Sequence, residues 1–188
     1  MKILCSLFLK VLGWRVVDNW PKDIKKAILI GLPHTSNWDF FLSMAYFIQV
    51  EIPYRFTIKK EWMRFPFSII LKKLGALSID RTNKKGTVSY ISDYIKELSH
   101  DESFFMLVTP EGTRSKVQTL KTGFYQMAIQ AGVPILFGFV DYGKKEIGIG
   151  SVLHPSGNYK EDLEVIKNFY RNKKPKYPKR FDINLRPS

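Results

Sequence analysis

A histidine and an aspartate stand five positions apart in the segment Pro33-His34-Thr35-Ser36-Asn37-Trp38-Asp39. An imidazole titrates near neutral pH, so His34 can accept a proton from a reacting group. An ionised Asp39 on the other ring nitrogen would fix the tautomer of His34 and stabilise the imidazolium. These are two of the three groups of a nucleophilic triad. No serine or cysteine of the chain has to complete it, because the attacking hydroxyl or amine can belong to a substrate.

A histidine–aspartate pair recurs by chance, so its meaning depends on its context. The pair follows the apolar run Ala27 to Leu32, which has the composition of a buried central strand. A second apolar run, Phe104 to Val108, leads in the same way into the polar segment Thr109 to Ser115. Ligands of open α/β sheets bind at the carboxyl ends of the strands, and both polar clusters are expected there.

The elements that must position these clusters alternate along the chain. Strands are predicted at 27–32, 54–58, 75–81, 104–108, 133–140 and 146–153, the last at a sheet edge, with a further short strand at 181–185. Helices are predicted at about 37–48, 82–99, 122–130 and 160–170, the first capped by Asn37 so that Asp39 lies in its first turn. This alternation predicts a single α/β domain with a mixed, mostly parallel sheet flanked by helices.

Composition excludes several classes of protein. The chain has 188 residues, 45% of them hydrophobic and 14% aromatic, which suits one ordered domain with a sizeable core rather than a disordered segment. Its single cysteine, Cys5, excludes an internal disulfide and a multi-cysteine zinc site. The three histidines stand in unrelated surroundings, so no metal site is expected.

The charge balance indicates what kind of partner the surface attracts. The chain carries 30 Lys and Arg against 17 Asp and Glu, a formal net charge of +13. Such a surface attracts phosphate in nucleic acid, in anionic lipid or on a small substrate. The basic segment 171–180, with Tyr177 inside it and Tyr170 and Phe181 beside it, makes a nucleic-acid-binding module the main non-enzyme alternative. A solvated loop or a membrane-contacting patch is the preferred interpretation of that segment.

The first fifteen residues mix apolar side chains with Lys2, Lys10 and Arg15. Their apolar run is far shorter than the roughly 20 residues that a spanning helix needs, and no small-residue cleavage site follows it, so neither a spanning helix nor a signal peptide is expected. An amphipathic helix lying in the membrane interface fits the pattern, with Trp14 at the head-group level. A helix that packs into the core fits it equally well.

Taken together, the polar clusters resemble the motifs of the glycerolipid acyltransferase family, the lysophosphatidic acid acyltransferases and their relatives. The first motif of that family is a histidine followed after four residues by an aspartate, as in His34 and Asp39. The other motifs are matched in order by Lys60, Glu61, Pro66, Gly75 and Arg81, by Pro110 to Ser115, and by Val133, Pro134 and Ile135. The resemblance spans about residues 28–140. Pro33 and Thr109 depart from the commonest pattern, but neither replaces a reacting group.

The resemblance implies transfer of a fatty acyl group from a thioester of coenzyme A or acyl carrier protein to the hydroxyl of a lysophospholipid such as 1-acylglycerol-3-phosphate. His34 would take the acceptor's proton and Asp39 would orient the ring, so neither a covalent acyl-enzyme nor a cofactor is expected. Relatives also acylate glycerol-3-phosphate, other lysophospholipids and amino-acid lipids, and these acceptors stay open.

The second and third motifs of the family are linked to the phosphate of the acceptor. The resemblance therefore implies that Lys60, Arg81, Glu111, Gly112, Thr113 and Arg114 bind substrate. The residue types agree, because arginine offers a planar fork of donors, lysine a point charge, and glycine a close approach of the backbone. Arg81 can instead form a surface ion pair with Asp80. Glu111 is expected to accept hydrogen bonds within its loop or to orient Arg114.

On this interpretation residues 1–20 form an amphipathic membrane-associating helix, and residues 21–188 form the acyltransferase domain. The expected location is peripheral, on the anionic cytoplasmic face of a membrane, because a lipid acceptor and an acyl chain must reach His34 from a bilayer. No nucleic-acid partner is expected. A hydrolase in which His34 activates water is the alternative within enzymes.

Overall fold

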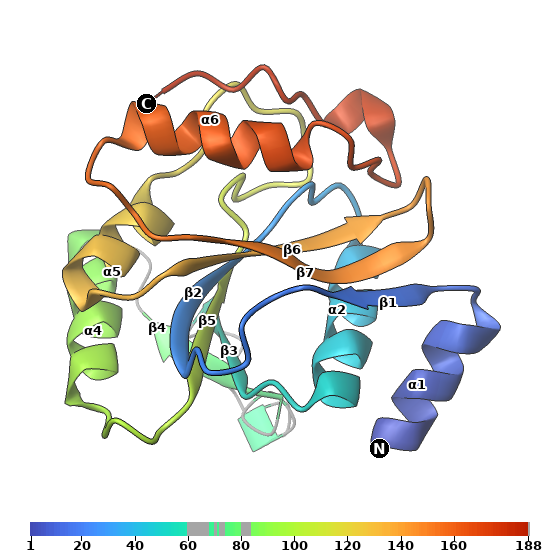
Figure 1. Cartoon of the computed structure of the whole chain (residues 1–188), viewed down its shortest axis with the longest axis horizontal. Helices are drawn as coiled ribbons and strands as arrows, with labels where there is room; N and C mark the ends of the chain where they lie inside the picture. The colour runs from blue at the N-terminus through green and yellow to red at the C-terminus, as the bar shows by residue number, and fades with distance from the viewer. Residues whose placement is uncertain (60–67, 70, 72–73, 80–83, 188) are drawn as a thin grey trace.

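A seven-stranded mixed sheet forms the centre of the protein in a computed structural model, which describes residues 1–59, 68–69, 71, 74–79 and 84–187 (Figure 1). Its strands are β1 (Arg15–Asp18), β2 (Lys26–Gly31), β3 (Tyr54–Lys59), β4 (Ala76–Ile79), β5 (Phe104–Val108), β6 (Ile135–Asp141) and β7 (Glu146–Leu153). They lie in the order β1-β7-β6-β2-β5-β3-β4. Only β6 and β7 pair antiparallel. The predicted α/β fold with a mixed, mostly parallel sheet is confirmed.

Strand β2 occupies the middle of this sheet. It pairs in parallel with β5, where Ile30 stands opposite Val108, and with β6, where Ile28 stands opposite Ile135. Ala27 to Ile30 are fully buried, because helices cover both faces of the sheet and a central parallel strand must then be apolar on both sides. The ends of β2 and β5 therefore meet at one edge, which brings the two polar clusters together.

Helices pack on both faces of the sheet in the described part of the chain. They are α1 (Lys2–Val11), α2 (Asn37–Val50), α4 (Lys84–Glu97), α5 (Gly123–Ala131) and α6 (Tyr159–Tyr170). Ile28 and Ile30 face the core that holds residues of α4, α5 and α6, whereas Ala27 and Leu29 face the core that holds residues of α1 and α2. This alternation is the two-residue period of a strand.

The first turn of α2 carries Asp39, as expected, but the cap is Ser36 and not Asn37. The Ser36 side chain accepts a hydrogen bond from the Trp38 N–H at 3.2 Å, and the Asp39 side chain accepts one from the Ser36 N–H at 2.9 Å. These reciprocal bonds form a capping box and satisfy donors that a helix start leaves free. A serine three residues before an acidic residue is the sequence signal for this cap.

The amino-terminal segment contributes a strand as well as a helix. Helix α1 ends at Val11, Gly13 adopts a positive φ of 75°, and Arg15–Asp18 pairs in parallel with β7 as β1. Strand β7 is therefore flanked on both sides, and β1 takes the sheet edge where β7 was expected; Val16 and Val17 favour an extended backbone. Among the described residues, no helix is long and apolar enough to cross a membrane.

The segment after α6 has little regular structure. It forms the 3₁₀ turn η2 (Pro178–Arg180), and residues 181–185 do not form the predicted strand. One isolated bridge joins Thr119 and Arg186. The apolar pattern there reflects packing rather than pairing, because Leu185 is buried in the core beside α5 and α6 residues.

Candidate active site

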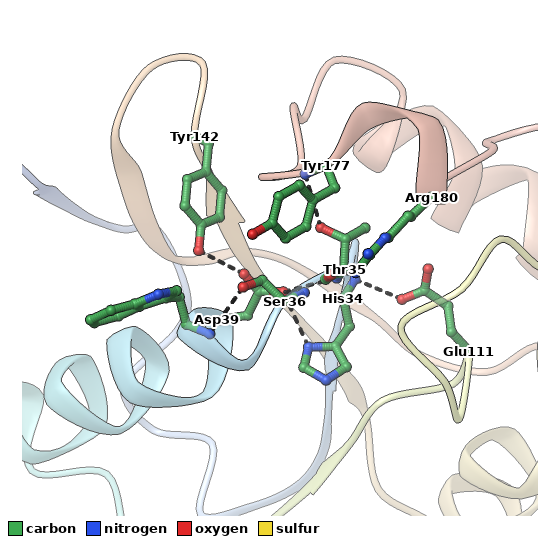
Figure 2. Close-up of polar contacts among 9 residues, drawn as sticks. His34, Thr35, Ser36, Asp39, Glu111, Tyr142, Tyr177 and Arg180 are labelled. Carbon is green, nitrogen blue, oxygen red and sulfur yellow. Dashed lines mark hydrogen bonds and ion pairs between the residues drawn. The ribbon is translucent and has the colours of Figure 1, made fainter.

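His34 and Asp39 lie together at the end of β2. The His34 Nδ1 is 3.2 Å from the Asp39 Oδ2, and that same oxygen accepts hydrogen bonds from the Thr35 and Ser36 N–H groups at 2.9 Å each (Figure 2). The carboxylate is buried and stands at the start of α2, where the helix dipole favours negative charge. With Nδ1 directed at Asp39, the Nε2 on the far side of the ring is the nitrogen that remains for a substrate.

Tyr142 supplies a further hydrogen bond to Asp39. Its hydroxyl donates to the Asp39 Oδ1 at 2.7 Å from the turn that follows β6 (Figure 2). Burial and the neighbouring carboxylate raise the pKa of the Tyr142 hydroxyl, so it stays protonated and remains a donor. Tyr142 was not predicted from the sequence, because it lies outside the four motifs. The only feature of the sequence that marks it is its position just after a predicted strand.

Glu111 connects the third motif to the first. Its Oε2 accepts a hydrogen bond from the His34 N–H at 2.7 Å, rather than a bond within its own loop (Figure 2). Burial, and to a smaller degree the charge of Asp39, raise the pKa of Glu111 to about 8, although the His34 N–H opposes the shift. Glu111 therefore holds the backbone of His34 in place and carries a proton near neutral pH.

A cavity of about 580 Å³ opens beside His34. Its lining includes the polar side chains of His34, Arg114 and Lys121, and apolar side chains from α2, β3 and β5 that include Phe40, Phe41, Phe56 and Leu107. A molecule with an anionic head and an apolar chain matches this mixed lining.

Two cations line the cavity, Arg114 from the third motif and Lys121 from beyond it. Gly112 has a positive φ of 63°, and a β-carbon there would collide with the Lys121 side chain. Glycine thus permits both the turn and the passage of Lys121 across it. Lys121 was not predicted, because its place depends on a chain reversal in which its N–H donates to the Pro110 carbonyl at 2.9 Å.

The structure describes one of the remaining predicted site residues, Thr113, and it does not line the cavity. Thr113 is exposed, and its hydroxyl accepts a hydrogen bond from the Ser115 N–H at 3.3 Å. Lys60 and Arg81, with Glu61 and Pro66 of the same motif, lie outside the described residues, and their role stays a prediction.

The fourth motif supports the sheet. The Pro134 carbonyl accepts a hydrogen bond from the Ile28 N–H at 3.0 Å, and Ile135 stands opposite Ile28 in the β2–β6 pairing. Its contribution to the site is therefore indirect, through the position of β2.

The basic segment 171–180 lies over the first motif. The Tyr177 N–H donates to the Thr35 hydroxyl at 3.2 Å, and the Arg180 guanidinium approaches the Thr35 carbonyl at 3.4 Å (Figure 2). The Lys176 ammonium stands 5.2 Å from the centre of the Trp38 ring, which is half exposed. Trp38 thus belongs to the contact between this segment and the start of α2.

The site suits proton abstraction from a bound hydroxyl. An imidazole faces a cavity, a buried carboxylate orients it, and cations that line the same cavity can hold an anionic group. Within the described ranges, no cluster of three or more His, Cys, Asp or Glu side chains could hold a metal ion.

Comparisons with known proteins agree on one family. A family model described as Acyltransferase matches residues 15–136. A 1-acyl-sn-glycerol-3-phosphate acyltransferase of Haemophilus influenzae is 33% identical over an alignment of 134 residues that covers 66% of this chain and 52% of that protein, so the chain spans about half of this relative. The crystal structure of the 1-acyl-sn-glycerophosphate (LPA) acyltransferase PlsC from Thermotoga maritima has the same fold, with a TM-score of 0.59 at 18% identity over 93% of this chain and 80% of that one.

Proposed function

The chain belongs to the acyltransferase family, and we propose that it transfers a fatty acyl group from an acyl thioester to the hydroxyl of a lysophospholipid such as 1-acylglycerol-3-phosphate. The observation that carries the proposal is the His34–Asp39 pair beside a cavity whose lining also holds two cations and several aromatic side chains. The names of the two relatives support this class of acceptor.

In the proposed reaction the acceptor hydroxyl attacks the thioester carbonyl while the His34 Nε2 takes its proton. The new carbon–oxygen bond forms, the carbon–sulfur bond breaks, and the imidazolium returns the proton to the departing thiolate. Asp39 stabilises the imidazolium that exists between these two transfers. The substrate hydroxyl acts as the nucleophile, so no acyl-enzyme forms.

The acceptor's phosphate would bind at Arg114 and Lys121. Arg114 offers a planar pair of donors and Lys121 a mobile point charge, and both line the cavity that holds His34. Lys60 and Arg81 are further proposed ligands for the same phosphate, on the family resemblance alone. The acyl chain would lie against the apolar side chains of the cavity, and either coenzyme A or acyl carrier protein can present it there.

We also propose that the protein associates peripherally with an anionic membrane through α1. Leu9 of α1 is buried against the core, whereas Ile3, Leu4, Leu7 and Val11 are 82%, 69%, 55% and 74% exposed. The helix thus combines the two interpretations of its sequence, because one side packs into the core and the other side exposes apolar side chains that can enter a membrane interface. Exposed apolar side chains on a helix of a chain with net charge +13 fit an interfacial helix on anionic lipid.

The test is a panel of acceptors with one radiolabelled acyl donor, read by the identity of the product. We expect acylation of 1-acylglycerol-3-phosphate, with glycerol-3-phosphate and lyso-amino-acid lipids as the competing acceptors. His34→Ala should lower kcat/KM by roughly a thousandfold without unfolding the protein. His100→Ala, an exposed histidine outside the site, is the matched control. Free fatty acid as the sole product would instead indicate a hydrolase, and near-normal activity of His34→Ala would exclude His34 as the base.

A further inference from the structure

We infer that Tyr142 is a positioning residue, which fixes the carboxylate of Asp39 and joins the His34–Asp39 pair to two segments outside the four motifs. The kinetic test of this inference rests on the proposed function. Nothing in the motif pattern marks Tyr142, which lies 103 residues from Asp39 in the sequence.

The two oxygens of Asp39 are held by different parts of the chain. Oδ2 receives the Thr35 and Ser36 N–H groups and faces the His34 ring, all within the first motif. Oδ1 receives the Tyr142 hydroxyl at 2.7 Å from the far side of the carboxylate (Figure 2). The first motif therefore holds one oxygen, and Tyr142 determines how the carboxylate is rotated about that anchor.

Tyr142 is itself held by two other segments. Its ring stands edge-on to the ring of Trp14, with the ring centroids 5.0 Å apart. Trp14 lies in the link between α1 and β1. The Tyr142 N–H donates to the Lys174 carbonyl at 2.8 Å, within the basic segment 171–180. The residue that orients Asp39 is thus in contact with the link between α1 and β1 and with the segment that covers the first motif.

Loss of the hydroxyl has a predictable effect. Without a donor at Oδ1, the buried carboxylate loses part of its stabilisation and holds the imidazolium of His34 more tightly. The His34 titration should then move to higher pH, and the acidic limb of the pH profile of kcat/KM should move with it. Other titratable or charged groups around the pair come from the loop between β5 and α5 and from the basic segment. They are Glu111, Arg114, Lys121, Tyr177 and Arg180.

The experiment compares Tyr142→Phe with Tyr125→Phe. The Tyr125 hydroxyl donates to the buried Asp162 at 2.6 Å, so its removal deletes a similar hydrogen bond away from His34. We expect Tyr142→Phe to lower kcat roughly tenfold with KM unchanged, because a carboxylate held only at Oδ2 can turn and no longer keeps the His34 ring in the reacting orientation. Tyr125→Phe should lower the unfolding midpoint but leave kcat and the pH profile of the folded fraction unchanged.

A readout that needs no turnover completes the test. The ring resonances of His34, identified by their loss in His34→Ala, are titrated by NMR in the wild type and in both tyrosine variants. A shift to higher pH in Tyr142→Phe alone supports the inference even if no acceptor is acylated, in which case the proposed function fails by itself. An active wild type whose kcat and His34 titration are the same in Tyr142→Phe would overturn the inference and leave the function standing.

The contact with Trp14 gives a second test. Trp14→Ala should lower kcat in the wild type but not further in the Tyr142→Phe background, because both changes act through the same hydroxyl. Trp20→Ala is the control, since the Trp20 ring packs on the ring of Phe105 and not on that of Tyr142. Additive losses in the double variant would show that Trp14 does not act through Tyr142.

Discussion

At the scale of single residues, Glu111 is an unusual member of the site because it is buried beside a second carboxylate. Its side chain is 3% exposed, and Tyr170, Asp39 and the His34 backbone surround it. Burial disfavours the ionised form more strongly than the single hydrogen bond from His34 favours it. A protonated Glu111 adds no negative charge next to Asp39, which leaves Asp39 as the ionised partner of His34.

This arrangement predicts how stability depends on pH. The pKa of Glu111 rises from its ordinary value of 4.5 to about 8 on folding, so between these values the folded state binds a proton that the unfolded state has lost. The free energy of unfolding should therefore decrease as the pH rises from about 4.5 to about 8. The side chain in Glu111→Gln cannot ionise, so the free energy of unfolding of this variant should decrease less over the same pH range.

Urea unfolding at a series of pH values measures the effect. Glu164→Gln, which removes an exposed carboxylate on α6, is the matched control and should keep the wild-type slope. If wild type and Glu111→Gln gave parallel curves from pH 5 to 8, Glu111 would ionise normally in the folded protein.

At the scale of elements, the sequence predicted most of what depends on neighbouring residues. The apolar runs of β2 and β5, the start of α2 with Asp39 in its first turn and the extent of α5 are local signals, and the sequence predicts each of them, although the cap is Ser36 and not Asn37. Strand order and the position of β1 depend on pairings between distant segments, which periodicity does not encode. Tyr142, Lys121 and the segment over Thr35 were missed for the same reason.

Helix α1 is the element whose role is most directly testable. Replacing Leu4 and Leu7 by serine should weaken sedimentation with anionic vesicles at least tenfold, because both side chains are exposed and would lose their burial in lipid. The unfolding midpoint should stay the same, since neither side chain belongs to the core. Ile129→Ser, at an exposed position of α5, is the control. Unchanged sedimentation of the Leu4/Leu7 variant would assign membrane contact to another surface.

At the scale of the whole molecule, the net charge of +13 has two possible uses. The contacts of the basic segment with Thr35 and Trp38 place part of this charge next to the first motif, which favours an anionic lipid over a nucleic acid. We expect the protein to bind vesicles that contain anionic lipid, with an affinity that decreases as salt screens the charges, and to bind zwitterionic vesicles weakly at any salt.

Vesicle sedimentation across a salt series checks this expectation. A duplex-DNA titration under the same conditions is the comparison, because nucleic-acid binding would show a linear dependence of log affinity on log salt. Binding that was tighter to duplex than to anionic vesicles would overturn the lipid assignment of the charge.

The contact between Thr35 and Tyr177 also sets the order in which the protein can become active. The two residues are 142 positions apart in the sequence, and the hydrogen bond between Asp39 and Tyr142 likewise joins residues 103 positions apart. During synthesis the His34 loop leaves the ribosome long before the groups that hold it in place, and contacts of such separation form late in folding. A nascent chain would therefore carry the histidine and the aspartate without their final geometry, and the proposed acyl transfer would begin only after residue 177 has joined the fold.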